Sequence, residues 1–187
     1  MRNGILYPGI VLKRVLGQKG KKAIDIGTKV HLETGRFGMN KAIFITGVSL
    51  GNGGYAIAER FAREGWDIFI TSRKLERAQQ AAEQLVKDYG IYAKGYQLWF
   101  RDEQAVKNVF EDIDRQGRFI ETVCLYAADL GAGKDPAEGM KIFETDIEDF
   151  QKVIDTNVVW NFMIVRQAAL RMRKEHRGAI VFIGSNS

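Results

Sequence analysis

The 187-residue sequence is poor in residues that form covalent or metal cross-links, with one cysteine and two histidines. The single cysteine, Cys124, excludes an internal disulfide framework, and its place in the apolar run TVCLY indicates a buried, unreactive thiol. His31 and His176 lie far apart without neighbours at ligand spacing, so we expect no metal site. No apolar run approaches the roughly 20 residues that a membrane-spanning helix needs, so we expect no membrane partner.

Charge is divided unevenly along the chain. Residues 1–38 contain eight Lys or Arg and two Asp or Glu. The remaining residues contain 20 Lys or Arg and 21 Asp or Glu. The overall charge of +5 therefore belongs to the N-terminal segment. Such a segment could contact nucleic acid or an acidic membrane, but we expect a loosely ordered extension that binds neither. We predict a single domain over residues 39–187. With Pro8 and no cleavage site near the start, a signal peptide is not expected, which makes the cytoplasm the default location.

From Met39 onward, short apolar runs alternate with segments of helical composition. Strands are expected at 41–46, 67–71, 92–98, 120–126 and 179–184, and helices at 55–64, 75–89, 103–115 and 145–174. The first helix is expected to place apolar Ala56, Ile57 and Phe61 on one face, and the last to begin at a capping box of Thr145 and Glu148. This alternation predicts an α/β fold, a doubly wound parallel sheet with helices on both faces.

Four glycines, at positions 47, 51, 53 and 54, separate the first strand from the first helix. Glycine allows positive φ angles and close approach of a ligand to the backbone. The helix that follows offers unpaired N–H groups and a partial positive charge, which suit a phosphate group. A merely flexible turn is the alternative, but the strand before and the helix after this turn favour a nucleotide site.

Four segments in order resemble the short-chain dehydrogenase/reductase family. TGVSLGNG, Thr46–Gly53, is similar to its TGxxxGxG turn, and VCLYAA occupies the place of its Asn-Asn-Ala-Gly motif. VIDTNVVWNF resembles the helix segment with the active-site asparagine, and GAIVFIGSNS resembles the strand that ends in the catalytic serine. The similarity covers residues 40–187 and implies a Rossmann-like domain. It implies an NAD(P)-dependent oxidoreductase that transfers hydride between nicotinamide and a carbonyl or alcohol substrate.

The resemblance also implies which residues form the site. Asn157 would hold a proton-relay water, and Ser185 would hydrogen-bond the substrate oxygen. The residues implied to bind the cofactor are Gly47, Ser49, Leu50, Gly51, Gly53, Arg73, Ala127 and Ala128. The implied partner is a small carbonyl or alcohol molecule, and the completed protein is expected to be a homo-oligomer.

Several positions depart from the family pattern. Gly54 is an extra residue in the glycine turn, and Leu125 and Tyr126 stand where the family has two asparagines. Ala128 replaces the glycine of the same motif, and Trp99 replaces an aspartate expected after the third strand. These changes would reshape the turn and alter the adenine contact.

The catalytic Tyr-x-x-x-Lys of the family is expected beyond Ser187, and none of the six tyrosines has a lysine four residues later. We therefore expect a fragment that is catalytically incomplete as given, with a sheet incomplete at the C-terminal side. A non-catalytic NAD(P)-binding or sensor protein is the alternative function.

The end of the second strand reads TSRK, with Arg73 and no acidic residue before Glu76. An acid there would accept hydrogen bonds from the ribose hydroxyls and select NAD, whereas Arg73 can bind a 2′-phosphate. The sequence therefore favours NADP(H) over NAD(H). A methyltransferase on a similar fold is a third possibility, but it would require an acid at this strand end.

Overall fold

The computed structural model describes residues 41–98, 102–129 and 143–184. Within them the strands are β1 (Lys41–Ile45), β2 (Asp67–Ser72), β3 (Ala93–Gln97), β4 (Phe119–Leu125) and β5 (Ala179–Phe182). The helices are α1 (Gly53–Ala62), α2 (Leu75–Tyr89), α3 (Glu103–Arg115), α4 (Ile147–Ile154), the π-helical turn η1 (Asp155–Trp160) and α5 (Asn161–Glu175). The domain boundary predicted after residue 38 and the prediction for Trp99 lie outside the described residues.

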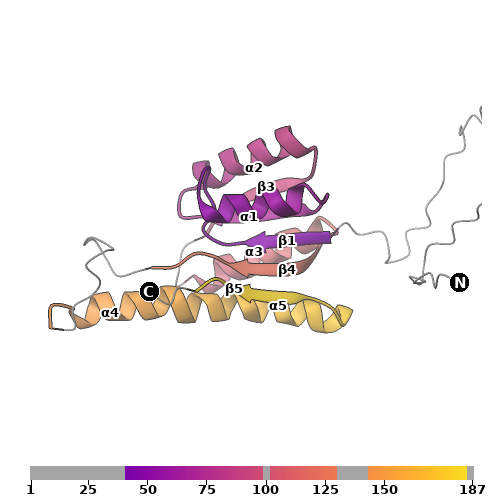
Figure 1. Cartoon of the computed structure of the whole chain (residues 1–187). Helices are drawn as coiled ribbons and strands as arrows, with labels where there is room; N and C mark the ends of the chain where they lie inside the picture. The colour runs from indigo at the N-terminus through magenta and orange to yellow at the C-terminus, as the bar shows by residue number, and fades with distance from the viewer. Residues whose placement is uncertain (1–40, 99–101, 130–142, 185–187) are drawn as a thin grey trace, which may run out of the picture. The chain divides into compact units, whose positions relative to one another are not determined.

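The strands form one parallel sheet in the order β3-β2-β1-β4-β5 (Figure 1). From β1 the chain moves outward through β2 to β3, and β4 then returns to the other side of β1. The strand order therefore reverses between β1 and β4. In open α/β sheets this reversal creates a crevice at the carboxyl ends of the strands, where ligands bind.

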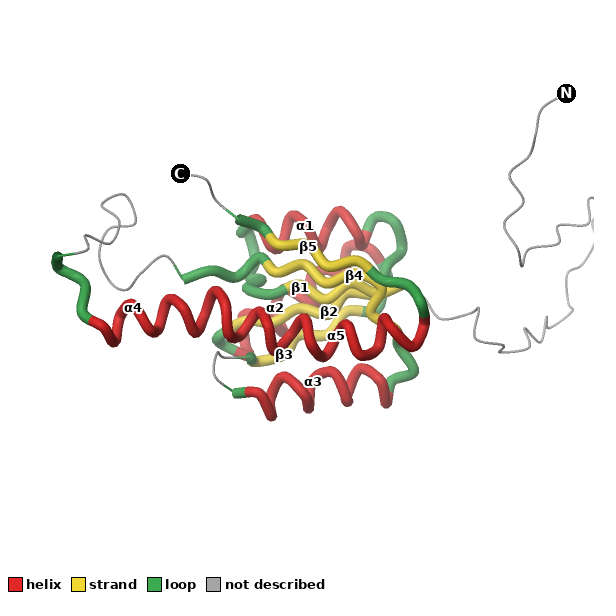
Figure 2. The backbone as a smooth tube through the Cα atoms, turned by 90° about the horizontal axis from the view of Figure 1, so that it is seen from below, coloured by secondary structure: helices red, strands yellow, loops and turns green. Residues whose placement is uncertain are grey.

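The central strands are buried on both faces, as their apolar runs predict. Ala42 to Ile45 of β1 and Ile68 to Ile70 of β2 have no exposed surface. One core lies between the sheet and α3 and α5, where the rings of Phe44 and Phe110 are 5.1 Å apart. A second core lies on the opposite face beneath α1 and α2 (Figure 2). The predicted doubly wound α/β fold is confirmed.

Helix α1 begins earlier than its sequence pattern predicted. It starts at Gly53, two residues before Tyr55, because the Asn52 side chain accepts a hydrogen bond from the Tyr55 amide at 2.9 Å and caps the helix. Of the residues predicted to share its apolar face, Ile57 and Phe61 are partly buried and pack against the core, whereas Ala56 is exposed. The buried side chains on α1 are those of Tyr55, Ala58 and Ala62. On α3, the apolar residues that recur at helical spacing in the sequence are all buried; they are Val106, Val109, Phe110 and Ile113.

The single long helix predicted from Thr145 is interrupted. The N-cap is Asp146 and not Thr145: the Asp146 side chain accepts from the Asp149 amide at 2.8 Å, and α4 begins at Ile147. Between α4 and α5, residues 155–160 form a π-helical turn. Two pairs of buried residues here are five positions apart: Asp155 with Trp160 inside the turn, and Thr156 with Asn161, the first residue of α5. This spacing accommodates one residue more than an α-helical turn.

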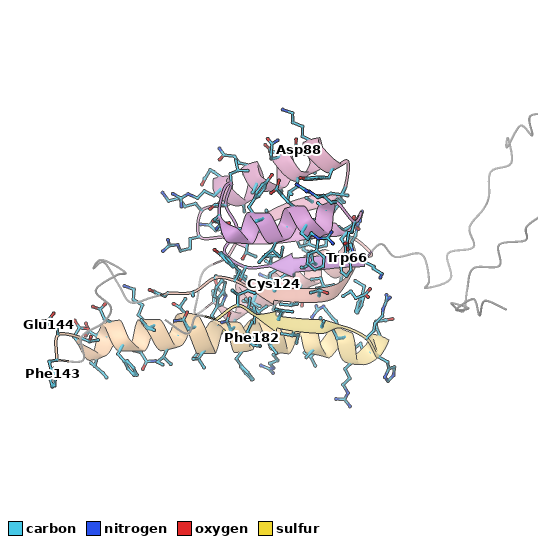
Figure 3. The ribbon with its side chains drawn as sticks, in the orientation of Figure 1. Trp66, Asp88, Cys124, Phe143, Glu144 and Phe182 are labelled. Atoms are coloured by element: carbon cyan, nitrogen blue, oxygen red, sulfur yellow. The ribbon has the colours of Figure 1, made fainter. Side chains whose placement is uncertain are left out.

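Strand β5 forms one edge of the described sheet, and Val181 and Phe182 there are 42% and 60% exposed. Figure 3 labels Phe182 at the end of β5, and it labels Phe143 before the start of α4, away from the strands. An exposed apolar strand edge of this kind can pair with a further strand or be covered by another element. In the described parts of the chain, every helix is too short or too polar to span a membrane.

Candidate functional site

The glycine turn connects the carboxyl end of β1 to the start of α1. Gly47 and Gly51 have φ angles of +73° and +79°, which residues with a side chain rarely adopt. A Cβ built on Gly47 would lie 2.8 Å from Cβ of Ala127, so glycine is also required because the end of β4 lies close. A Cβ on Gly51 meets nothing within 4 Å, so the outer side of the turn has room for a ligand.

The Asn52 side chain holds this turn in shape. Its Nδ2 donates to the Gly47 carbonyl at 2.8 Å, and its Oδ1 accepts from the amides of Ser49 and Tyr55 at 3.3 and 2.9 Å. Sequence reasoning did not identify Asn52 as a site residue. The signal was available, because asparagine immediately before a helix is a favoured cap. One side chain therefore fixes both the turn and the helix start.

Thr46 joins the ends of β1 and β4. Its buried Oγ1 accepts hydrogen bonds from the amides of Tyr126 and Ala127, each at 3.0 Å. The predicted cofactor residues Ala127 and Ala128 follow directly after β4, where Ala127 is partly buried and Ala128 is exposed. Thr46 therefore keeps this segment beside the glycine turn at the point where the strand order reverses.

The π-helical turn presents Asn157 to the segment after β4. Asn157 Oδ1 accepts from the Asp129 amide at 2.8 Å, and its Nδ2 donates to the Asp129 carbonyl at 2.6 Å. The Asn157 carbonyl in turn accepts from Asn161 Nδ2 at 2.8 Å. Because Asp129 follows the carboxyl end of β4, Asn157 lies at the same edge of the sheet as the glycine turn.

Arg73 directly follows β2 at the same edge. Its side chain is exposed, and its backbone carbonyl accepts from Gln97 Nε2 at 3.1 Å. The amide of Val48 in the glycine turn donates to the Thr71 carbonyl at 2.8 Å, which ties the turn to the end of β2. Arg73 is therefore held beside the turn, in the position expected for the adenosine side of a dinucleotide.

Cys124 is 3% exposed within β4, and burial raises the pKa of its thiol (Figure 3). The thiol is therefore no nucleophile at neutral pH, as its apolar sequence environment indicates. The described residues also contain no cluster of His, Cys, Asp or Glu that could hold a metal ion.

The structure brings most of the predicted site residues to one edge of the sheet. Gly47 and Ser49 belong to one turn, Leu50 and Gly51 form its exposed tip, and Gly53 is the first residue of α1. The other predicted residues at this edge are Arg73, Ala127, Ala128 and Asn157. The predicted catalytic residue Ser185 lies outside the described residues.

Comparison with known proteins gives a family match. Residues 41–187 match the family model described as short chain dehydrogenase. The chain is 28% identical over 146 residues to 3-oxoacyl-acyl-carrier-protein reductase FabG of Aquifex aeolicus (strain VF5), an alignment that covers 78% of this chain and 55% of that protein.

Two solved structures are also similar. L-sorbose reductase from Gluconobacter frateurii, complexed with NADPH and L-sorbose, is 26% identical with a TM-score of 0.66 and matches over 77% of this chain and 52% of its own. NAD⁺-bound xylitol dehydrogenase is 26% identical with a TM-score of 0.69, and the match covers 79% of this chain and 54% of that dehydrogenase. The chain thus spans about half the length of the relatives it matches.

Proposed function

Because the chain belongs to the short-chain dehydrogenase family, we propose that it is the cofactor-binding part of an NAD(P)-dependent oxidoreductase. The bound cofactor would give or take a hydride, with a small carbonyl or alcohol compound as the other reactant. The observation that carries this proposal is the glycine turn at the reversal of strand order, followed by the N-terminus of α1. A non-catalytic binding protein is not favoured, because the relatives are named as reductases and dehydrogenases.

The residues present fit a dinucleotide. The outer side of Gly51 is open, and Gly53 is exposed at the first position of α1. Amides there would bind the pyrophosphate, and Ala127 and Ala128 would border the nicotinamide half. Asn157 would keep the segment after β4 in place through its two hydrogen bonds with Asp129.

We propose NADP(H) as the preferred cofactor. Exposed Arg73 directly after β2 supports this choice, because a guanidinium can bind a 2′-phosphate through paired, charge-assisted hydrogen bonds. The similar structures bind both kinds of cofactor, NADPH in one and NAD⁺ in the other.

We also propose a homo-oligomer in the cytoplasm, with small molecules rather than nucleic acid or membrane as partners. Apolar side chains exposed along α4, η1 and α5 support contact with a second copy; they are Ile147, Phe150, Val158 and Phe162. A buried free thiol, Cys124, fits a reducing compartment.

Calorimetric titration with NADPH tests the proposal, using two matched glycine variants. Gly51 and Gly65 have φ angles of +79° and +76°, and a Cβ on either meets nothing within 4 Å. Alanine should therefore cost each site a similar backbone strain of about 1 kcal/mol. Gly65 lies between α1 and β2, at the opposite edge of the sheet.

Gly51→Ala should weaken NADPH binding about ten-fold or more, because it distorts the turn that holds the phosphates. Gly65→Ala should leave the affinity unchanged. If the wild-type protein binds neither NADPH nor NADH, or if both variants lose affinity equally, the proposed function is wrong.

A further inference from the structure

Two departures from the family sequence pattern, the extra glycine and Tyr126, are in contact. A Cβ built on Gly53 would lie 2.8 Å from the Tyr126 hydroxyl oxygen, and one built on Gly54 would lie 3.0 Å from its Cδ1. The Tyr126 ring therefore lies along the first two residues of α1. Side chains at either position would collide with it, so the pair of glycines makes room for this ring.

The hydroxyl end of the ring lies at the start of the helix. The Cα–Cβ direction in an α-helix tilts toward its N-terminus, so an atom close to the Cβ position of Gly53 is close to the helix end. Tyr126 itself follows β4, and its amide is bonded to Thr46 on β1. Its side chain thus crosses from β4 to α1 over the point where the strand order reverses.

The helix that begins beside this hydroxyl carries donors without a protein acceptor. The Tyr55 amide is satisfied by Asn52, whereas the amides of Gly53 and Gly54 find no protein acceptor among the residues that the structure describes. Gly53 is exposed and Tyr126 is partly exposed, so a ligand can reach both. A phenol hydroxyl is a hydrogen-bond donor, and with the free amides and the helix dipole it suits a doubly charged diphosphate.

We propose that Tyr126 is a cofactor-binding residue whose hydroxyl donates a hydrogen bond to the pyrophosphate of the dinucleotide. This inference rests on the proposed function and assigns to Tyr126 a contact that the sequence comparison did not indicate. The pyrophosphate would then receive hydrogen bonds from two elements: from the Tyr126 hydroxyl after β4, and from the backbone amides at the start of α1.

Tyr126→Phe removes the hydroxyl and keeps the ring against the glycines. Tyr89→Phe is the matched control, because its hydroxyl donates to Glu59 at 3.1 Å on the surface formed by α1 and α2. Dissociation constants are measured by calorimetry for NADPH, NADH and adenosine 2′-monophosphate, which carries a phosphate but no pyrophosphate. Urea unfolding verifies that both variants are folded.

Tyr126→Phe should weaken NADPH and NADH binding about ten-fold and leave the affinity for adenosine 2′-monophosphate unchanged, since hydrogen bonds to charged groups are the strong ones. Tyr89→Phe should change none of the three constants. Unchanged or tighter NADPH binding by Tyr126→Phe would overturn the assignment, while the proposed function would still stand. Failure of wild type to bind either dinucleotide would instead reject the proposed function.

Discussion

Asn157 and Asp129 are joined by two hydrogen bonds across 28 residues of sequence, one at 2.8 Å from the Asp129 amide and one at 2.6 Å to its carbonyl. A side-chain amide paired in this way mimics a neighbouring backbone strand. The two hydrogen bonds thereby fix the segment after β4 to the π-helical turn between α4 and α5.

Asn157→Ala should lower the free energy of unfolding by about 1–3 kcal/mol, because it removes both bonds to partly buried backbone groups. Hydrogen exchange of the Asp129 amide should become faster. Asn108→Ala on α3 is the control, since the Asn108 side chain accepts only an exposed bond from Gln104 in the described structure. Equal losses in the two variants would contradict the positioning role of Asn157.

Asn52 serves two purposes that substitution can separate. Asn52→Ala should destabilise the protein by about 1 kcal/mol and weaken NADPH binding, because it removes the cap of α1 and the bond to Gly47. Asn52→Asp should retain the cap but still weaken binding, because it adds a negative charge beside the phosphates. Urea unfolding and calorimetry measure the two effects.

Asp102→Ala is the control for this experiment. Asp102 caps α3 by accepting from the Ala105 amide at 2.7 Å. Its loss should cost similar stability and leave NADPH affinity unchanged. A parallel loss of affinity in Asp102→Ala would show that helix stability, and not the turn, determines binding.

A carboxylate between β3 and α3 should make stability depend on pH. Asp112 accepts from Lys94 Nζ at 2.7 Å and from the Tyr96 hydroxyl at 2.9 Å, and these bonds, that of Lys94 first, lower its pKa from 3.8 to about 2. The folded-state pKa is the lower one, so the ionised carboxylate stabilises the protein fully above its unfolded pKa. This contribution should disappear as the pH falls from about 4 to about 2.

The measurement is the urea midpoint of wild type and Asp112→Asn from about pH 6 to about pH 2. Wild type should be more stable at the upper end, and the difference should shrink below about pH 4. When both proteins also carry Lys94→Met, the difference in urea midpoint caused by Asp112→Asn should be smaller at every pH. The hydrogen bond from Lys94, the largest cause of the lowered pKa of Asp112, is then absent. A difference that is constant with pH would contradict this assignment.

Arg73→Ala should reduce the preference for NADPH over NADH about ten-fold, because a charge-assisted contact with the 2′-phosphate is lost. Arg77→Ala is the matched control one turn further along α2, where the side chain is also exposed. The ratio of the two dissociation constants is the readout. Equal binding of both cofactors by wild type, or a ratio that Arg73→Ala leaves unchanged, would contradict a role for Arg73.

The fold could be predicted from the sequence where local pattern and burial agree. The continuous apolar runs of β1 and β2 are typical of buried strands, and the apolar residues of α3 recur at helical spacing. The type of each element and its place in the order along the chain therefore follow from the local sequence. The glycine turn was likewise recognisable, because its strand and helix are adjacent in sequence.

The remaining features depend on contacts between distant residues. The ring of Tyr126 on Gly53, and the pairing of Asn157 with Asp129, join segments whose proximity only the folded sheet determines. The most deeply buried face of α1 also depends on contacts with the sheet. Ile57 and Phe61 pack against the core but stay partly exposed, because close packing against the sheet favours the small Ala58 and Ala62 at the most buried positions.

The π-helical turn at Asp155–Trp160 has a consequence for how this helix tolerates changes in length. A one-residue deletion inside the turn could be absorbed by regular α-helix, leaving both flanks in phase. A one-residue deletion between Ile164 and Met172 of α5 would instead rotate one of these buried side chains by roughly 100° relative to the other about the helix axis. Relatives with and without the extra residue would therefore superimpose on both sides of the turn, while an ungapped alignment through it would misplace every position on one side.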